Sequence, residues 1–129
     1  MIMPMVLVDT SVWVAHFRKS NASFEALLIN DQILCHPLVL IELACGSPPS
    51  PRSKTLGYIE KLQQATVATP AETLEFIERH QLQESGCGAI DVSLLASTLL
   101  SENALLWTLD KNLEKLADRL GVSYNIKLH

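Results

Sequence analysis

The sequence predicts an α/β fold, in which three layers, α/β/α, surround a central and mainly parallel sheet. Three short apolar runs, at residues 5–8, 33–35 and 104–107, have the length and composition of strands buried on both faces. Helical patterns separate these runs, and strands that alternate with helices form parallel sheets covered on both faces. The 129 residues fit one domain spanning 1–129, and a hydrophobic content of 48% is sufficient for a core.

The helices are predicted from apolar periodicity and from residues that start or stop a helix. Pro37 suits a first helical turn, and Gly46 and Gly121 suit helix ends. A helix opening at Pro70 carries Leu74, Ile77 and Leu82 among its apolar residues. Residues 65–68 are predicted as a weak strand and residues 122–124 as an edge strand. The other predicted helices span residues 11–18, 22–28, 37–46, 51–64, 89–100 and 110–121.

The charge balance and the cysteines narrow the class of protein. Ten basic residues face 14 acidic ones, for a net charge of -4, so the chain is not a domain that binds nucleic acid through bulk positive charge. Three cysteines form neither a complete disulfide framework nor a zinc-site spacing, which indicates a reducing cytoplasm. No apolar run approaches membrane-spanning length, so we expect a soluble protein without an anchor.

Four acidic residues occupy unusual positions. Asp9 ends the first predicted strand, and Asp110 lies just past the third. Asp91 lies at the start of an apolar helix, and Glu42 is flanked on both sides by aliphatic residues. Helix capping or helix-dipole interactions would explain the three aspartates individually. Glu42 is harder to explain in this way, because a buried acid is costly unless it is paired or bound to a metal.

The carboxyl ends of parallel strands lie at one edge of a sheet, so these four acids can converge there. Clustered carboxylates repel one another, and a divalent cation relieves that repulsion. Oxygen ligands alone favour Mg²⁺ or Mn²⁺ over zinc. Sites of this kind orient phosphate groups and activate water for phosphodiester cleavage. We therefore expect a metal site at this edge.

Around these acids the sequence resembles the PIN-domain ribonucleases and, within them, the VapC toxins of type II toxin–antitoxin pairs. The resemblance covers nearly the whole chain, and its motifs occur in the family's order. No single motif is specific, but four in register are a strong signal. They are Val8-Asp-Thr-Ser-Val-Trp13, with His16-Phe-Arg18 after it, Glu42 followed by Gly46, Asp91 with Ala96 downstream, and Thr108-Leu-Asp-Lys-Asn112.

The resemblance implies one PIN-like domain that acts as an Mg²⁺- or Mn²⁺-dependent endoribonuclease and hydrolyses RNA with a water that the metal activates. The residues that match the catalytic, metal-holding acids of the family are Asp9, Glu42, Asp91 and Asp110. Ser11 and Thr108 match hydroxyl positions that support these acids. Asn112 stands where the family often has another acid, which places a second tightly held metal in doubt.

The resemblance also implies partners. A cognate VapB-like antitoxin would wrap the protein and place a basic side chain in the acidic pocket, and the protein would form a homodimer. Four cations are candidates for contacts with RNA phosphates, although scattered surface charge explains any one of them: Arg18, Lys19, Arg52 and Lys54. Trp13 is expected in packing or in an interface. His36 has no evident partner, and we expect a surface or turn position for it.

Two alternatives remain open at this point. A phospho-acceptor receiver domain has a similar length and fold class, but such domains usually carry adjacent acids after the first strand, where this chain has Asp9-Thr10. A non-catalytic PIN-like scaffold would keep the fold without the reaction, and only Asn112 favours it. A phosphatase of the Asp-x-Asp type is disfavoured, because Ser11 occupies the place of the second acid.

Overall fold

A computed structural model describes residues 3–124 and contains a parallel four-stranded sheet. The strand order is β3-β2-β1-β4, so the first strand lies inside the sheet and not at its edge. All pairings between neighbouring strands are parallel. The strands are β1 (Met5–Val8), β2 (Ile33–Cys35), β3 (Gln63–Gln64) and β4 (Ala104–Trp107).

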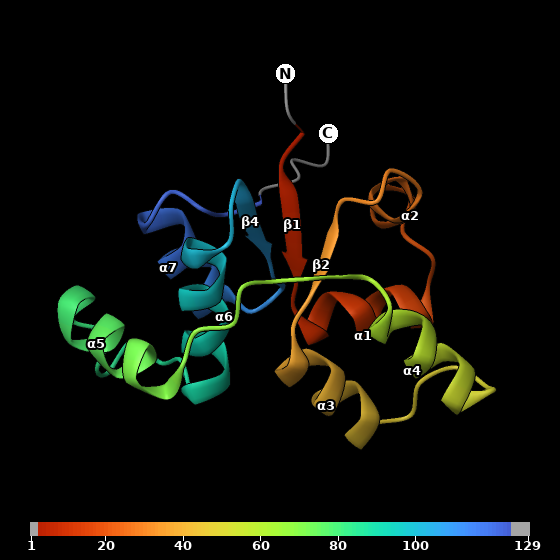
Figure 1. Cartoon of the computed structure of the whole chain (residues 1–129), viewed down its shortest axis with the longest axis horizontal. Helices are drawn as coiled ribbons and strands as arrows, with labels where there is room; N and C mark the ends of the chain where they lie inside the picture. The colour runs from red at the N-terminus through yellow and green to blue at the C-terminus, as the bar shows by residue number, and fades with distance from the viewer. Residues whose placement is uncertain (1–2, 125–129) are drawn as a thin grey trace.

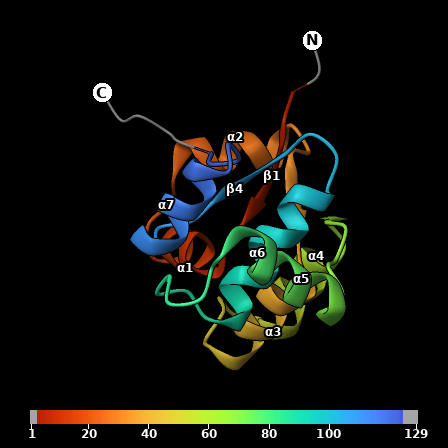
Figure 2. The same cartoon turned by 90° about the vertical axis from the view of Figure 1, so that its left-hand side faces the viewer.

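Helices cover the sheet on both sides and complete the predicted three layers. Figure 1 shows α1 to α4 on one side of the strands and α5 to α7 on the other. In Figure 2, α6 lies between α5 and α7, and it contacts both. The helices are α1 (Thr10–Arg18), α2 (Ala22–Ile29), α3 (Pro37–Cys45), α4 (Arg52–Glu60), α5 (Pro70–His80), α6 (Ala89–Leu100) and α7 (Lys111–Arg119).

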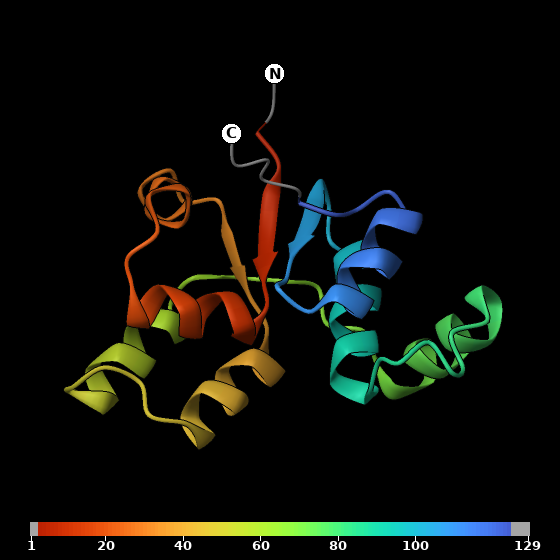
Figure 3. The same cartoon turned by 180° about the vertical axis from the view of Figure 1, so that it is seen from behind.

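The strand register brings the carboxyl ends of the strands together. Val8 pairs with Trp107, so the residues that follow β1 and β4 emerge side by side. Leu7 pairs with Leu34 in the other neighbour, β2. Figure 3 shows the arrowheads of these strands pointing to the same edge, where α1, α3 and α7 begin. The apolar strand residues are buried from both sides, as the sequence predicts.

The predicted elements are confirmed except around β3 and at some helix ends. The helix predicted to reach residue 64 ends at Glu60, and the strand lies at Gln63–Gln64 instead of residues 65–68. Both glutamines are exposed, and only backbone pairing with β2 makes them a strand, so no hydrophobic pattern marks it. At residues 122–124, a single parallel bridge joins Ser123 to Leu106.

Helix α5 ends before Leu82, which the sequence analysis placed on that helix. Gln81 adopts a left-handed conformation, with φ of 52°, and ends the helix. Leu82 then turns into the core, where its side chain is 3% exposed. The spacing of residues 74, 77 and 82 also fits the apolar face of one continuous helix, so the sequence pattern did not reveal that the helix ends at His80.

His36 joins the sheet to helices on both of its sides. Its side chain is 1% exposed, and Nδ1 accepts a hydrogen bond from the Leu38 N–H, which caps α3. Because Nδ1 accepts, the neutral ring carries its proton on Nε2, which donates to Ser97 Oγ of α6 at 3.0 Å. His36 lies in extended backbone between β2 and α3, and the expected surface position is wrong, because the ring is buried and has two partners.

Residues 3–124 include no helix that is both long enough and apolar enough to cross a lipid bilayer.

The buried His36 predicts that stability falls in mild acid. Burial lowers the pKa of His36 below its usual 6.5, so the unfolded chain binds a proton that the folded chain excludes. The free energy of unfolding therefore decreases as the pH falls below about 6.5. The variant His36→Asn keeps a cap acceptor without the titration, so it should lose less stability between pH 7.5 and 5.5 in urea unfolding. Equal losses in the two proteins would contradict this role.

Candidate functional site

The site is built around the buried carboxylate of Asp9 at the end of β1. Asp9 is 7% exposed and forms the N-cap of α1. Its Oδ1 accepts from the Thr10 N–H at 2.8 Å. Its Oδ2 accepts from the hydroxyls of Ser11, at 2.9 Å, and Thr108, at 2.7 Å. The Asp9 N–H also donates to the carbonyl of Trp107, so the ends of β1 and β4 are joined through both backbone and side chain.

Glu42 is joined to the same centre through α1. The hydroxyl of Thr10 donates to Glu42 Oε1 at 2.6 Å, across 32 residues of sequence. Since Glu42 lies in α3, this bond holds the middle of α3 against the first turn of α1. Sequence reasoning missed Thr10, although a hydroxyl directly after the strand-ending acid was a visible signal.

Asp110 and Asp91 enter from the other side of the sheet. Asp110 caps α7 by accepting from the Leu113 N–H, as its sequence position allowed, and its own N–H donates to Thr108 Oγ1. Asp91 lies in the first turn of α6. The pKa of Asp91 is raised, first by burial and then by the charges of Asp9 and Asp110. The charge of Glu42 raises it more weakly. Each of the other three acids therefore lies within electrostatic reach of Asp91.

A tight loop holds the start of α6 against the start of α7. Gly86 has a φ of +86°, and a Cβ placed on it would lie 2.7 Å from Asn112 Nδ2. A side chain at this position would both clash with Asn112 and strain the backbone. The loop continues through Cys87, whose pKa is raised by burial and by the nearby charges of Asp91 and Asp110. Asn112 therefore lies beside the acids and packs against the loop that leads into α6.

The four predicted RNA-contacting cations differ in their surroundings. Arg18 and Lys19 are exposed at the carboxyl end of α1. Arg52 donates from its guanidinium to the carbonyls of Ala44, at 2.6 Å, and Gly46, at 3.4 Å, which ties α4 to the end of α3. Lys54 lies beside an apolar groove between α1 and α4.

The donor chemistry of the four acids fits a hard divalent cation, because every side chain offers carboxylate oxygens. Asp9 uses three of about four acceptor positions, and Glu42 Oε2 and Asp110 Oδ2 accept no hydrogen bond from residues 3–124. Within the same range, no three His, Cys, Asp or Glu side chains lie close enough to hold one ion as they are placed.

Comparison with known proteins identifies the family. The family model described as PIN domain matches residues 6–119, which is most of the chain. The chain belongs to the PIN-domain family. Its relatives include Ribonuclease VapC32 from two strains of Mycobacterium tuberculosis, CDC 1551 / Oshkosh and ATCC 25618 / H37Rv. Each is 43% identical over 119 residues, which cover 92% of this chain and 95% of the relative.

These matches confirm the resemblance to PIN-domain ribonucleases of the VapC group and the predicted fold class. They also favour the nuclease interpretation over a receiver domain. In this PIN domain, the four acids follow β1, lie in α3, begin α6 and follow β4. Four segments that are distant in the sequence therefore each contribute one acid near the edge where β1 ends.

The crowding of charge predicts that Asp91 destabilises the PIN domain in the absence of metal. Because the surroundings of Asp91 disfavour its charge on balance, Asp91→Asn should raise the melting temperature in EDTA. Solvent screening at this half-buried residue limits the gain to about 2 °C.

The matched control for this change is Glu102→Gln, which removes one charge from the exposed turn before β4 and should leave the melting temperature nearly unchanged. Thermal unfolding followed by circular dichroism measures both variants. A lower melting temperature for Asp91→Asn than for the native protein in EDTA would show that repulsion does not dominate at this position.

Proposed function

We propose that this chain is a divalent-metal-dependent endoribonuclease in which Asp9, Glu42, Asp91 and Asp110 hold the ion. The observation that carries this proposal is the hydrogen-bond network at the end of β1: Thr10 donates to Glu42, and Thr108 joins Asp9 to Asp110. Asp91 lies close enough for the charges of the other three acids to raise its pKa. Membership of the PIN-domain family and the name Ribonuclease VapC32 of the two relatives support the reaction class. Mg²⁺ is the ion that we propose, with Mn²⁺ as a substitute, because the ligands are oxygens only.

The hydroxyls around Asp9 and Glu42 fix the direction in which these carboxylates point. Ser11 and Thr108 both donate to Asp9 Oδ2, so they hold that side chain while leaving about one acceptor position for a cation. Thr10 donates to Glu42 Oε1 and leaves Oε2 available. Such supporting hydrogen bonds orient ligands and influence metal affinity in known metal sites.

In the proposed reaction, the bound ion would lower the pKa of a water and stabilise negative charge on the phosphate group. The carboxylates of this chain hold the ion and position the attacking water. They orient the attacking water by accepting its hydrogen bonds, and Glu42 Oε2 and Asp110 Oδ2 are the oxygens without a protein partner in residues 3–124. No histidine or lysine is required as a general base. The amide of Asn112 adds no charge, which favours one tightly held ion.

Among the basic residues, Arg18 and Lys19 are the stronger candidates for RNA phosphate contacts. Both are exposed at the end of α1, the helix that begins at Asp9. Arg52 has its guanidinium engaged with carbonyls of the α3 end, and Lys54 lies beside an apolar groove. The choice among tRNA, rRNA and mRNA depends on surface shape, and we propose only RNA as the class of substrate.

An apolar groove between α1 and α4 is our proposed docking surface for a VapB-like antitoxin. Trp13, Phe17 and Tyr58 line it, and the Trp13 Nε1–H is the one buried side-chain donor in residues 3–124 without a hydrogen-bond partner. Because this donor is buried, Trp13 would contribute the apolar surface of its ring to the docking surface and not a hydrogen bond. A basic side chain of the antitoxin would then reach the four acids and compete with the cation.

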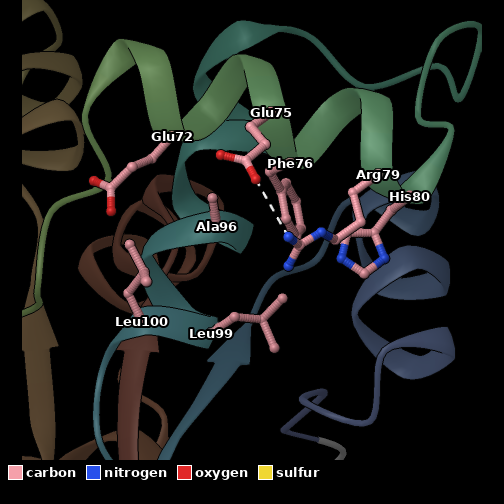
Figure 4. A pocket seen from close by; sticks show the side chains of 8 residues that line it. All are labelled: Glu72, Glu75, Phe76, Arg79, His80, Ala96, Leu99 and Leu100. Carbon is pink, nitrogen blue, oxygen red and sulfur yellow. Dashed lines mark hydrogen bonds and ion pairs between the residues drawn. The ribbon is translucent and has the colours of Figure 1, made fainter.

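A homodimer is proposed through α5 and α6. Figure 4 shows Leu99 of α6 below Phe76 of α5, Leu100 further to the left on α6, and the exposed ion pair of Arg79 and Glu75. Leu99 is 41% exposed and Leu100 is 45% exposed. Burying these leucines against a second copy would remove apolar surface from water. A monomeric mass by light scattering at micromolar concentration would overturn this assignment.

A reducing cytoplasm is the compartment that we propose. Cys35, Cys45 and Cys87 are all free thiols in the structure. Free cysteines persist where thiols are kept reduced, and an RNA substrate is consistent with that location.

The function is tested by metal-dependent cleavage of purified tRNA and rRNA. Native protein should cleave in Mg²⁺ or Mn²⁺ and not in EDTA. Asp9→Asn and Asp91→Asn should each lose at least roughly hundredfold in rate, because each removes a proposed metal ligand. The control Glu102→Gln, which removes a surface charge outside the cluster, should cleave at the native rate.

Cleavage products mapped by primer extension identify the broken bonds. If native protein binds Mn²⁺ but its cleavage equals that of Asp9→Asn, the activity comes from a contaminant and the proposal fails. If it binds RNA without cleaving it under any metal condition, the non-catalytic scaffold is the better interpretation.

A further inference from the structure

A cavity of about 590 Å³ lies next to Glu42, between α1, α3 and the loop after α3. One side is formed by Val14, Phe17 and Arg18, which share one face of α1 at spacings of three and four residues. The other sides are formed by residues of α3 and of the loop after it: Glu42, Leu43, Gly46, Ser47, Pro48 and Pro49.

The walls of the cavity are held in place by hydrogen bonds from α4. The Arg52 guanidinium donates to the carbonyl of Gly46, and the Thr55 hydroxyl donates to the carbonyl of Pro49 at 2.8 Å. Leu43 is 3% exposed, so it connects the cavity to the core. Two prolines in the loop have restricted backbone freedom. The cavity is therefore preformed, as small-molecule sites usually are.

The polar groups of the cavity lie beside its apolar walls. Glu42 belongs both to the cavity and to the group of four acids. Arg18 is exposed, and it forms no ion pair or side-chain hydrogen bond with any residue of the range 3–124. Val14, Phe17 and the two prolines supply apolar surface for a flat ring. A nucleotide has a matching arrangement, because its ring is joined through ribose to phosphates.

We propose that this cavity binds the base of a nucleotide adjacent to the cleaved bond, with Arg18 paired to a phosphate of the same strand. The inference rests on the proposed ribonuclease function, since it uses the acids to position the scissile phosphate. It further implies that the RNA is single-stranded at this position, because a base that is paired in a duplex is not free to enter a pocket. The apolar walls contact a base through its faces, and such contacts tolerate different bases.

The direct test fills the cavity. Val14→Trp places a large ring in the space, and Ala15→Trp places the same ring on an exposed position of the same helix. The substrate is a short single-stranded fragment of an RNA that the native protein cleaves, with the cleaved bond mapped. Val14→Trp should raise KM roughly tenfold with little change in kcat, because base binding is shared by the ground and transition states. Ala15→Trp should leave both parameters near native values.

Two further measurements separate a base pocket from a structural effect of the large ring. An abasic nucleotide beside the cleaved bond should raise KM for native protein and have little effect on Val14→Trp, which has already lost the contact. Arg18→Gln should lower the slope of log KM against log salt by about one, the change expected when one phosphate contact is lost. Arg18→Lys should restore much of the slope. Melting curves confirm that each variant is folded.

A readout without cleavage uses nucleoside 5′-monophosphates. Titration of native protein should shift the NMR signals of the Val14 and Leu43 methyl groups, and Arg18→Gln should weaken this binding several-fold. Shifts confined to other parts of the protein would overturn the proposal.

The outcomes distinguish this inference from the proposed function. If metal-dependent cleavage requires Asp9 and Asp91, but Val14→Trp and Ala15→Trp have equal KM values, the ribonuclease stands and the base pocket is wrong. If Val14→Trp impairs only the binding of a protein partner, the cavity serves that partner and the base pocket is again wrong. If no metal-dependent cleavage exists, the proposed function itself has failed.

Discussion

The buried carboxylate of Asp9 is the group on which the arrangement of the site depends. A charge removed from water must be compensated, and Asp9 accepts hydrogen bonds from one backbone N–H and two hydroxyls. These donors belong to the start of α1 and to the segment after β4. The same segments reach Glu42 through Thr10 and Asp110 through Thr108. One compensated charge therefore sets the relative positions of three acids.

A second hydrogen-bond network joins the helix of Glu42 to the helix of Asp91, the fourth acid. His36 caps α3, the helix of Glu42, and donates to Ser97 in α6, the helix of Asp91. Ser97 also accepts from the Ala68 N–H, which ties in the segment before α5. Because the ring stays neutral and buried, this network holds the two helices together without adding charge near the acids.

Local sequence features predicted much of this structure. Strand-ending acids and parallel strands were sufficient to place Asp9 and Asp110 at one edge, and both residues also cap helices as their positions suggested. The bonds of Thr10 with Glu42 and of His36 with Ser97 span 32 and 61 residues, so no local pattern reveals them. The same limit explains β3, whose exposed glutamines become a strand only by pairing with β2.

The net charge of -4 has a different meaning in the structure. Ten basic residues balance all acids except four, and four acids form the proposed site. A bound divalent cation offsets two of the four negative charges and presents a positive charge to the phosphate, so an acidic chain can still receive RNA. RNA binding is then expected to depend on the ion as well as on Arg18 and Lys19.

The most direct test of the central role of Asp9 is Mn²⁺ binding measured by electron paramagnetic resonance in the absence of RNA. Thr108→Val removes one hydroxyl that holds Asp9 and leaves all four acids in place. It should weaken Mn²⁺ binding by about tenfold or more, the usual effect of losing such a supporting bond. The control Thr98→Val removes a buried hydroxyl that donates to the Leu94 carbonyl within α6, and it should bind Mn²⁺ as native protein does. Equal Mn²⁺ affinity in native protein and Thr108→Val would contradict the claim that the hydrogen-bonded Asp9 organises the site.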